Sequence, residues 1–485
     1  PESWNPAETA LIICDMWDSH HSGNAARRTA ELAPHLDRFA KSVRTSGALV
    51  IHAPSSTIDF YRDHPARKRA IGLADAPDLP PDIGSWCHWK DNTEEAVGYP
   101  VDHSDGGEDD DPEELKAWHA KLKAQGRTVG SPWQRQIATI AIDPDKDAIS
   151  DSGTEIWNLL HQRKIKNVFL AGVHTNMCVL GRPFGLRQLS RNGKNVVLVR
   201  DLTDTMYNPA MRPFVSHFRG TDLVVAHTEQ QVCPTVTSDQ ILRGSPAFRF
   251  AADKRKNLVA LIAEAEYKTA DTLPPFLETN LQDHFKIGFC LPHPEDPNRL
   301  LGAGKIATAD LLLVSVRRRT PPTAQLATIR AHVQSGKPVV GIRTSSHAFA
   351  LRKGSPPDGM SAWPEFDAGV LGGNYQGHHG NKLRTSATVT STAHPVLNGL
   401  TEGLKFPTGG SLYINTPLRP GALALATGSA ESVERDEPVA WVNTPGSGSR
   451  VFYTSLGHPD DFSSKAFVTL LSNACLWTAG IPVGQ

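Results

Sequence analysis

Short apolar runs separated by helical patterns dominate the first half of the chain. Residues 10–14 (ALIIC) and 168–173 (VFLAGV) are apolar at every position, which favours strands buried on both faces of a parallel sheet. A helical pattern over residues 25–46 ends at Gly47. Further strand candidates, each a short apolar run, lie at residues 48–53, 137–142, 196–199 and 222–226. Together they predict five or six parallel strands with helices between them.

The second half repeats this type of pattern without repeating the sequence. Apolar runs at residues 257–263, 310–316 and 338–342 predict buried strands, and a helical pattern over 324–335 ends at Gly336. Later strand-like stretches lie at 422–426, 439–442 and 450–455, and a closing helix is expected over 463–479. We therefore predict the α/β class, with two doubly wound three-layer αβα domains and mainly parallel sheets.

The length of 485 residues supports two domains, because one compact core rarely extends so far. We place the first domain at residues 1–235, a linker at 236–256 and the second domain at 257–485.

A long insertion, at about residues 54–133, interrupts the first domain and loses regular patterning. Such insertions often form lids or subunit contacts. Its centre is acidic, which predicts either a solvated loop or a segment that wraps a hard cation. The acidic residues are Asp102, Asp105, Glu108, Asp109, Asp110, Asp111, Glu113 and Glu114.

Composition excludes several classes of partner. With 50 basic and 51 acidic residues, nothing calls for nucleic acid or a membrane surface. The six cysteines lack CxxC spacing, which argues against zinc and against a disulfide framework, and we expect no metal and no cofactor. The sequence begins at Pro1 rather than methionine, so the localisation is unknown, with cytoplasmic and exported sites both open.

Two residues stand where catalysis is favoured in such sheets. Asp15 directly follows one buried strand, and Cys178 follows another at the start of a helical pattern. Ligands of open α/β sheets sit beyond the carboxyl ends of the strands, and a helix start can stabilise a thiolate. Each residue has an ordinary alternative: an aspartate often caps a loop, and a cysteine often packs as a small apolar side chain.

Three stretches make residues 8–230 resemble the isochorismatase-like cysteine hydrolase superfamily, which includes nicotinamidases and N-carbamoyl amidohydrolases: ALIICD (10–15), GVHTNMCVL (172–180) and VVLVRDLTD (196–204). The resemblance implies that Cys178 is the nucleophile and Asp15 the general base. It further implies that the backbone N–H groups of His174 and Cys178 form the oxyanion hole, with a cis peptide at Val173–His174.

The resemblance also implies a catalytic lysine shortly before the helix expected at Thr154. Lys146 is the candidate, but an alignment on the preceding loop places Ser150 or Asp151 there instead, and Arg135 is a further candidate cation. The metal motif of nicotinamidases has no match after Ala53, so nicotinamide is not the expected substrate. We expect the substrate pocket to include Trp17, His20, Trp86, Trp89, His174 and Asn176.

Residues 256–482 resemble the trehalose-utilisation ThuA-like group within the class I glutamine amidotransferase-like fold, on PVVGIRTSSHAF (338–349) and RVFYTSLGHPDDF (450–462). Arg343 stands where that fold has its nucleophilic cysteine, so glutaminase chemistry is not expected. A polar pocket for a sugar-like ligand or a metal is one interpretation of the nearby residues, and hydrogen-bonded loop histidines are the other. These residues are His347, His378, His379, His458 and Asp460.

The sequence therefore predicts a cysteine-dependent hydrolase that acts on a small-molecule amide, carbamoyl or similar C–N bond through a thioester-type intermediate on Cys178. A carbohydrate-active or sugar-binding protein that acts through the second domain, with a silent first domain, is the alternative. We expect a small-molecule substrate and a homo-oligomer, and neither nucleic acid nor membrane as partner.

Overall fold

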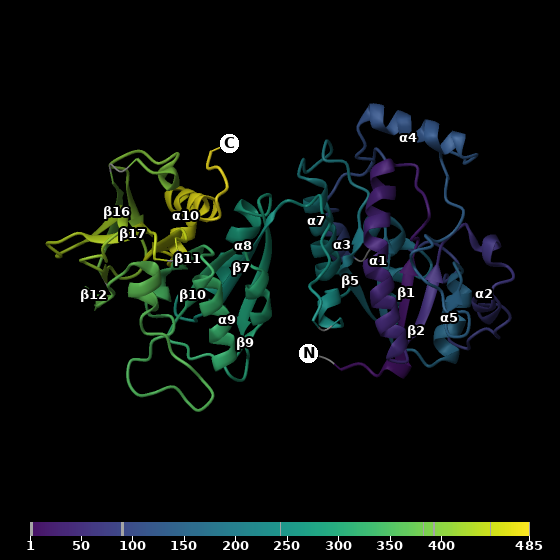
Figure 1. The fold of residues 1–485 in the computed structure, drawn as a ribbon, viewed down its shortest axis with the longest axis horizontal. Coiled ribbons are helices and arrows are strands. Elements are labelled where there is room, and N and C mark those ends of the chain that lie inside the picture. The colour runs from purple at the N-terminus through teal and green to yellow at the C-terminus, as the bar shows by residue number, and fades with distance from the viewer. Residues whose placement is uncertain are drawn as a thin grey trace. The chain divides into compact units, whose positions relative to one another are not determined.

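The computed structural model describes residues 3–88, 92–242, 244–381, 383–390, 393–446 and 448–484. The chain divides into two compact units, Pro1–Asp253 and Lys254–Gln485 (Figure 1). None of the described helices has both the length and the apolar composition needed to cross a membrane.

The first unit is built on a six-stranded parallel sheet in the order β3-β2-β1-β4-β5-β6. This confirms the predicted parallel α/β arrangement. The strands are β1 (Thr9–Cys14), β2 (Leu49–Ala53), β3 (Ala148–Ile149), β4 (Asn167–Val173), β5 (Asn195–Asp204) and β6 (Thr235–Val236).

Helices cover both faces of this sheet. Leu11 and Ile13 of β1 pack with α1 (Gly23–Thr45), which the Ser22 side chain caps by accepting a hydrogen bond from the Ala25 N–H. Ala10 and Ile12 face the other way, toward a core to which three further helices contribute. These are α5 (Gly153–Gln162), α6 (Leu186–Arg191) and α7 (His217–Gln231). The layers are therefore helix, sheet and helix.

Two strand predictions were wrong. Residues 137–142 form a loop, tied to the sheet edge by the Ile137 N–H, which donates to the Met16 carbonyl oxygen, and β3 occupies the expected strand position. Residues 222–226 lie inside α7, where Val224 and Val225 face the core together with Thr221 and Thr228. A five-residue apolar run cannot by itself distinguish a strand from one buried side of a helix.

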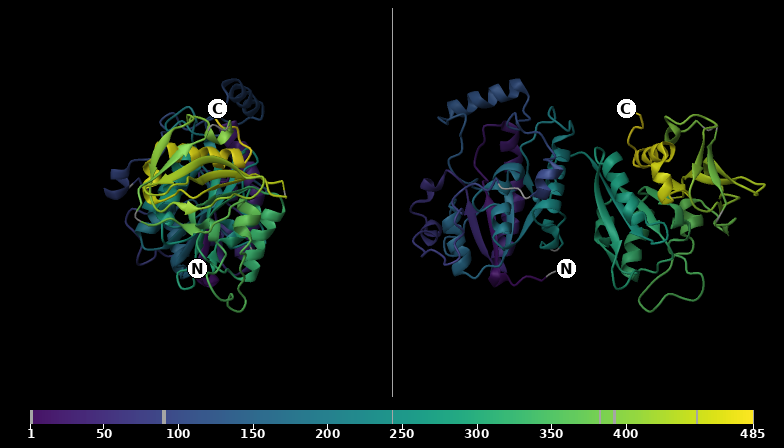
Figure 2. Two further views of the ribbon diagram at one scale, coloured as in Figure 1. Left: turned by 90° about the vertical axis from the view of Figure 1, so that its left-hand side faces the viewer. Right: turned by 180° about the vertical axis from the view of Figure 1, so that it is seen from behind.

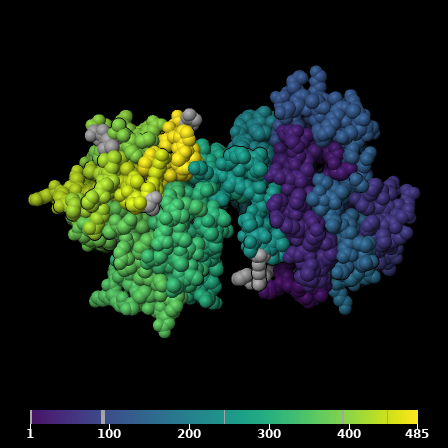
Figure 3. Space-filling model, in the orientation of Figure 1, coloured from purple at the N-terminus to yellow at the C-terminus, as the bar shows by residue number. Residues whose placement is uncertain are grey.

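The insertion contains short helices rather than sheet: η2 (Ile58–Tyr61), α2 (Pro65–Ala70), α3 (Asn92–Val97) and α4 (Pro112–Ala124). Figure 2 shows α4 as a separate helix at one end of the first unit, and Figure 3 shows the insertion (blue) at that unit's surface. Much of the segment expected as a linker lies against the first unit, because Phe248 and Phe250 are buried in its core.

The second unit has a ten-stranded mixed sheet in the order β14-β13-β16-β17-β18-β11-β10-β7-β8-β9. Strands β18, β11, β10, β7 and β8 are parallel, and antiparallel strands extend the sheet on both sides. The strands are β7 (Lys256–Ala263), β8 (Phe285–Pro292), β9 (Leu300–Leu301), β10 (Leu311–Val316), β11 (Val339–Ile342), β13 (Thr385–Val389), β14 (Lys405–Thr408), β16 (Leu423–Ala430), β17 (Glu437–Asn443) and β18 (Val451–Thr454). A separate ribbon pairs β12 (Gly377–His378) with β15 (Tyr413–Ile414).

Alternate residues of β7 again face opposite helical layers, which confirms a second three-layer unit. Leu258 and Ile262 pack with α8 (Thr269–Asn280) and α10 (Lys465–Thr478), whereas Val259 and Leu261 pack with α9 (Thr323–Gln334). Short turns complete the chain: η1 (Pro6–Glu8), η3 (Thr175–Val179), η4 (Ser238–Gln240), η5 (Ala303–Thr308), η6 (Arg343–His347), η7 (Asp367–Leu371), η8 (Pro395–Leu397) and η9 (Pro459–Ser463).

Candidate active site

The carboxyl ends of β1 and β4 bring Asp15 and the cysteine turn to one edge of the first sheet. The two strands are parallel neighbours in the register Cys14↔Gly172. Gly172 has φ +112, and an ideal Cβ there would lie 2.1 Å from the Cys14 carbonyl oxygen. Only glycine allows this close approach. This close approach of β1 and β4 sets the distance between Asp15, which follows β1, and the turn η3, which holds Cys178.

Asp15 lies at the centre of a small buried group. Its side chain is fully buried, its Oδ1 accepts a hydrogen bond from the Ser55 N–H at 2.8 Å, and the Cys178 thiol lies close enough to interact electrostatically with the same carboxyl. Its Oδ2 accepts from Arg182 Nε at 3.1 Å. The Arg182 charge also acts to lower the pKa of the thiol, so nucleophile, carboxylate and cation are mutual neighbours.

The backbone explains why Arg182 reaches this group. Its N–H donates to the Cys178 carbonyl oxygen at 3.0 Å, so the two side chains lie one helical turn apart. The guanidinium lies 4.5 Å from the centre of the Trp86 ring, which comes from the insertion. The insertion therefore covers the outer side of the cation.

Burial shapes the acid–base properties of the pair. It raises the pKa of Asp15, an effect that the Arg182 charge opposes. Burial also raises the pKa of the Cys178 thiol well above its usual value, and the Asp15 charge adds to this. Both shifts act in the same way: they favour the protonated thiol, and they make the ionised Asp15 a stronger base than an exposed aspartate.

The structure does not bring Lys146 to the thiol. Lys146 is exposed, in the loop that precedes β3, and its N–H donates to Asp143 Oδ1 at 3.1 Å. Because β3 runs parallel to β2, a residue before β3 lies toward the opposite edge of the sheet from Asp15. The residue at the carboxyl end of β3 is Ser150, whose hydroxyl donates to Glu155.

Arg135, the other candidate, lies 4.0 Å from the Asp18 carboxylate and over the Phe60 ring. Sequence reasoning missed Arg182. The available signal was its spacing, four residues after Cys178 in a helical pattern.

The turn that holds the cysteine is fixed by backbone and hydroxyl contacts. The Val173–His174 peptide is cis, which confirms that prediction. The His174 carbonyl oxygen accepts from the N–H groups of Met177 and Val179, each at 3.1 Å. Thr175 Oγ1 donates to the Asp204 carbonyl oxygen at 2.8 Å.

Three of the expected pocket residues form an aromatic group in the first unit. Trp17 donates its Nε1–H to the Ser55 carbonyl oxygen at 3.0 Å and stacks on Trp133, with ring centres 4.4 Å apart. The rings of His20 and His174 meet edge to face at 5.0 Å. Burial lowers the pKa of His174 to about 4, and its buried Nε2 has no hydrogen-bond partner among the residues that the structure describes. This neutral imidazole can hydrogen-bond to a ligand.

The other three expected pocket residues lie differently. Trp86 is 39% exposed and covers Arg182. Asn176 bonds to both the N–H and the carbonyl oxygen of Met206, which fixes the loop after β5. Trp89 lies outside the described residues.

The acidic insertion is tied to the first unit by a buried arginine. Arg28 of α1 donates to both Asp109 carboxylate oxygens, at 2.8 and 3.0 Å, and to Asp204 Oδ2 at 2.7 Å. Burial acts to raise the pKa of Asp204, but Arg28 and His217 outweigh it and hold that pKa well below its usual range. No group of three or more possible metal ligands occurs within the described ranges. These contacts favour ion pairing over cation wrapping for Asp109.

In the second unit the five expected residues do not form one pocket. His379 pairs with Glu437 at 3.2 Å, and His378 is exposed on β12. His347 stacks on Tyr375 with ring centres 4.6 Å apart. Among the residues that the structure describes, only His458 and Asp460 of the five bond to each other, where His458 caps η9.

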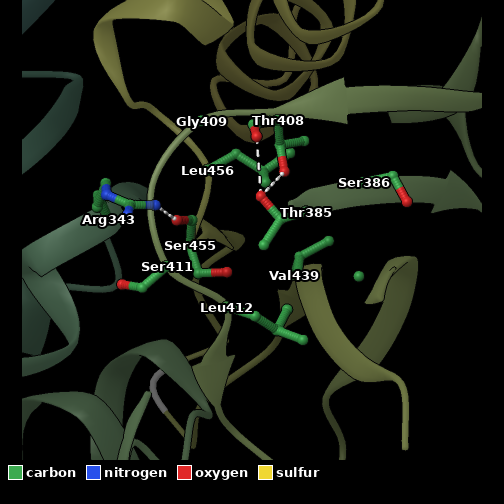
Figure 4. Close-up of a pocket in the computed structure, with 11 residues that line it drawn as sticks. Arg343, Thr385, Ser386, Thr408, Gly409, Ser411, Leu412, Val439, Ser455 and Leu456 are labelled. Atoms are coloured by element: carbon green, nitrogen blue, oxygen red, sulfur yellow. Dashed lines mark hydrogen bonds between the residues drawn. The ribbon is translucent and has the colours of Figure 1, made fainter. Parts of the chain in front are cut away.

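Arg343 occupies the strand-to-turn position after β11. It has φ +46, it is 1% exposed, and its Nη1 donates to the Ser455 carbonyl oxygen at 2.5 Å (Figure 4). A small pocket opens beside it, with Thr385 hydrogen-bonded to the Thr408 carbonyl oxygen across the far wall. The pocket is lined by Arg343, Thr385, Ser386, Thr408, Gly409, Ser411, Leu412, Gly428, Val439, Ser455 and Leu456.

Comparison with protein families matches both units. Residues 9–230 match the isochorismatase domain family, and residues 264–478 match the family described as ThuA, trehalose utilisation. No curated protein is similar enough to the chain to count as a match.

Solved structures resemble one unit at a time. A protein described as ThuA-like from Bacteroides uniformis ATCC 8492 is 19% identical, with 48% of this chain and 95% of that chain covered and a TM-score of 0.36. A cysteine hydrolase from Pseudomonas syringae pv. phaseolicola 1448A is 14% identical, with 50% and 94% covered and a TM-score of 0.29. A glutamine amidotransferase from Methylobacillus flagellatus is 15% identical, with 42% and 69% covered and a TM-score of 0.26.

Proposed function

We propose that the first unit, whose residues 9–230 match the isochorismatase domain family, is a cysteine-dependent hydrolase of a small-molecule amide, carbamoyl or similar C–N bond. The observation that carries this proposal is that β1 and β4 bring the buried Cys178 thiol beside Asp15, whose Oδ2 accepts a hydrogen bond from Arg182.

The first half of the reaction forms an acyl-enzyme. The Asp15 carboxylate takes the thiol proton as Cys178 sulfur attacks the carbonyl carbon, and the carbonyl oxygen becomes an oxyanion. The tetrahedral intermediate collapses when the C–N bond breaks. The leaving ammonia or amine takes the proton from Asp15, and a thioester remains on Cys178.

The second half regenerates the enzyme. Asp15 takes a proton from water, the resulting hydroxide attacks the thioester carbon, and the C–S bond breaks. The sulfur leaves as a thiolate and recovers the proton from Asp15. The products are one carboxylic or carbamic acid and one amine, so atoms and charge balance without a cofactor.

Arg182 accounts for how a buried thiolate can form at all. Before proton transfer the negative charge lies on Asp15, and afterwards it lies on Cys178 sulfur. Arg182 hydrogen-bonds to Asp15 and its charge also acts on the Cys178 thiol, so the site keeps one cation beside one anion in each state. A buried charge without a partner would cost several kcal/mol. Arg182 is therefore our candidate for the third member of the site.

The experiment measures ammonia release from a panel of primary amides and N-carbamoyl compounds. We expect the Cys178→Ala protein to show no release above background for any compound that the natural protein hydrolyses. Cys87→Ala is the matched control, because Cys87 is a buried thiol in the same unit that does not contact Asp15. Unchanged release by Cys178→Ala would eliminate the proposal.

The second unit supports ligand binding rather than catalysis as a companion role. Arg343 takes the position after β11, and both of this unit's cysteines are core residues, Cys290 and Cys475. Binding of a carbohydrate there, with a catalytically silent first unit, is the alternative. It predicts that Cys178 substitutions leave every activity of the chain unchanged.

A further inference from the structure

The buried Arg343 guanidinium is the starting point for a second site. The side chain is 1% exposed, and its Nη1 donates to a neutral carbonyl oxygen. Among the described residues it forms no salt bridge, and its Nε and Nη2 have no hydrogen-bond partner. A buried charge is normally paired, because an unpaired one costs much free energy.

Aromatic rings surround this guanidinium. Its Cζ lies 4.1 Å from the centre of the Tyr267 ring and 5.1 Å from that of Tyr413. Tyr375 lies 4.8 Å from Tyr413 and 4.6 Å from His347, ring centre to ring centre. Cation–π contact lowers the cost of the buried charge but supplies no counter-ion.

Further arginines extend this positive charge toward the surface. Arg318 follows β10 at φ +50, its N–H donates to the His347 carbonyl oxygen at 3.1 Å, and its Nη1 donates to the Ala350 carbonyl oxygen at 3.2 Å. Its Nε is buried without a partner in the described chain. Arg352 is exposed, and its charge, like that of Arg318, acts to lower the pKa of His347.

Positive charge predominates in this cluster, in which Asp461 is the acidic group that acts on Arg343 and Glu264 the one that acts on Arg319. Arg317 is paired with Glu266, whereas Arg318, Arg343 and Arg352 form no ion pair within the described ranges. Burial lowers the pKa of His347 to about 3, and the surrounding arginines contribute, so the imidazole is neutral. The cluster lies after β7, β10 and β11, at the carboxyl edge where parallel sheets bind ligands.

We propose that this edge of the second unit binds a small organic anion, a carboxylate or a phosphate ester, with its charged group between Arg318 and Arg343 and its body against the rings of Tyr267, Tyr375 and Tyr413. Guanidinium N–H groups match the oxygens of either anion. The series of positive charges from exposed Arg352 to buried Arg343 attracts the anion inward. This site is independent of Cys178 and of the activity proposed for the first unit.

Isothermal titration calorimetry on the full chain tests the site. The probes are glucose 6-phosphate and glucuronate, which carry the two anionic groups on one ring shape, and glucose, which is neutral. We expect one anion per chain, with glucose bound at least about tenfold more weakly than the better anion. Whichever anion binds more tightly identifies the charged group. Absence of binding by both anions, or equal binding of glucose, would overturn the proposal.

Variants locate the binding. Arg318→Met and Arg352→Met should each weaken binding of the anion, and Arg318→Met should raise the Kd by about tenfold or more. Arg352 is exposed, so we expect Arg352→Met to fold normally. It therefore still tests the location of the site if Arg318→Met does not fold. Lys405→Met, which removes one exposed charge from the edge strand β14, should leave affinity unchanged, as should Cys178→Ala. Full affinity in Arg352→Met, or loss in Cys178→Ala, would place the anion elsewhere and refute the site.

Discussion

Replacing Arg182 by methionine tests the assignment of the third member of the active site. The change removes the Nε that lies 3.1 Å from Asp15 Oδ2 and leaves a fully buried carboxylate without its cation. Methionine keeps most of the apolar stem, so packing against the Trp86 ring is largely retained.

The size of the effect follows from the lost contact. A hydrogen bond to a charged group is worth about 1.5–3 kcal/mol. If that contribution stabilises the charge shared by Asp15 and Cys178 in the transition state, kcat/KM falls by roughly 10- to 150-fold. Loss of one partner of a buried ion pair also lowers the free energy of unfolding by about 3–5 kcal/mol. Rates must therefore be normalised to the folded fraction measured by circular dichroism.

A pH profile separates this role from a merely structural one. Asp15 acts as a base only when ionised, so kcat/KM rises with pH through the pKa of Asp15, which burial has already raised. Removing the Arg182 charge removes the effect that opposes burial, so the acidic limb of the profile should move to higher pH. Arg182→Lys keeps a positive charge and should return the limb toward its original position.

Two substitutions serve as controls in the ammonia-release assay. Lys146→Met and Arg135→Met remove the other cations considered for this role, and both side chains lie away from the thiol. Both should keep kcat/KM within about twofold. The reasoning would be refuted if Lys146→Met lost activity while Arg182→Met kept the original rate and the original pH profile.

Three further outcomes are expected. Iodoacetamide should modify Cys178 first, because at 8% it is the most exposed of the six cysteines and Asp15 can take the thiol proton as the sulfur attacks, which offsets the raised pKa of the thiol. Asp15→Asn should slow this step, and mass spectrometry that finds six equal rates would contradict it. Gly172→Ala should lower the free energy of unfolding by about 3 kcal/mol, because residue 172 has a positive φ and its Cβ would lie 2.1 Å from the Cys14 carbonyl oxygen. An unchanged midpoint of urea unfolding would count against the close approach. Arg28→Met should destabilise the first unit by about 3–5 kcal/mol and speed proteolysis within residues 102–124, whereas Arg62→Met, which breaks an exposed pair with Asp59, should cost at most about 1 kcal/mol. Equal effects would show that the buried network is not needed.

The sequence was sufficient to locate the site but not to complete it. Asp15 and Cys178 each follow an apolar run, and parallel strands carry such residues to one edge of a sheet, so their proximity could be predicted. The third member could not be predicted in the same way. The strand expected at residues 137–142 is a loop, and the true strand β3 has two residues, so Lys146 precedes the strand instead of following it.

Long-range pairing explains what else was missed. The acidic residues looked solvated because no basic residue lies among them, yet Arg28 reaches Asp109 from a helix 81 positions earlier. Local patterns contain no information about such contacts. The same reason hid the cluster around Arg343, which joins residues that follow three separate strands with tyrosines from two further segments.

The central claim is that a covalent acyl group forms on Cys178. The most direct measurement is rapid acid quench of the protein with a substrate found in the ammonia-release panel, followed by peptide mass spectrometry. The account predicts that the peptide carrying Cys178 gains the mass of the acyl group, that hydroxylamine removes it, and that Cys178→Ala shows no adduct. Turnover of the same substrate with no adduct on this peptide, and an unchanged rate in Cys178→Ala, would contradict it.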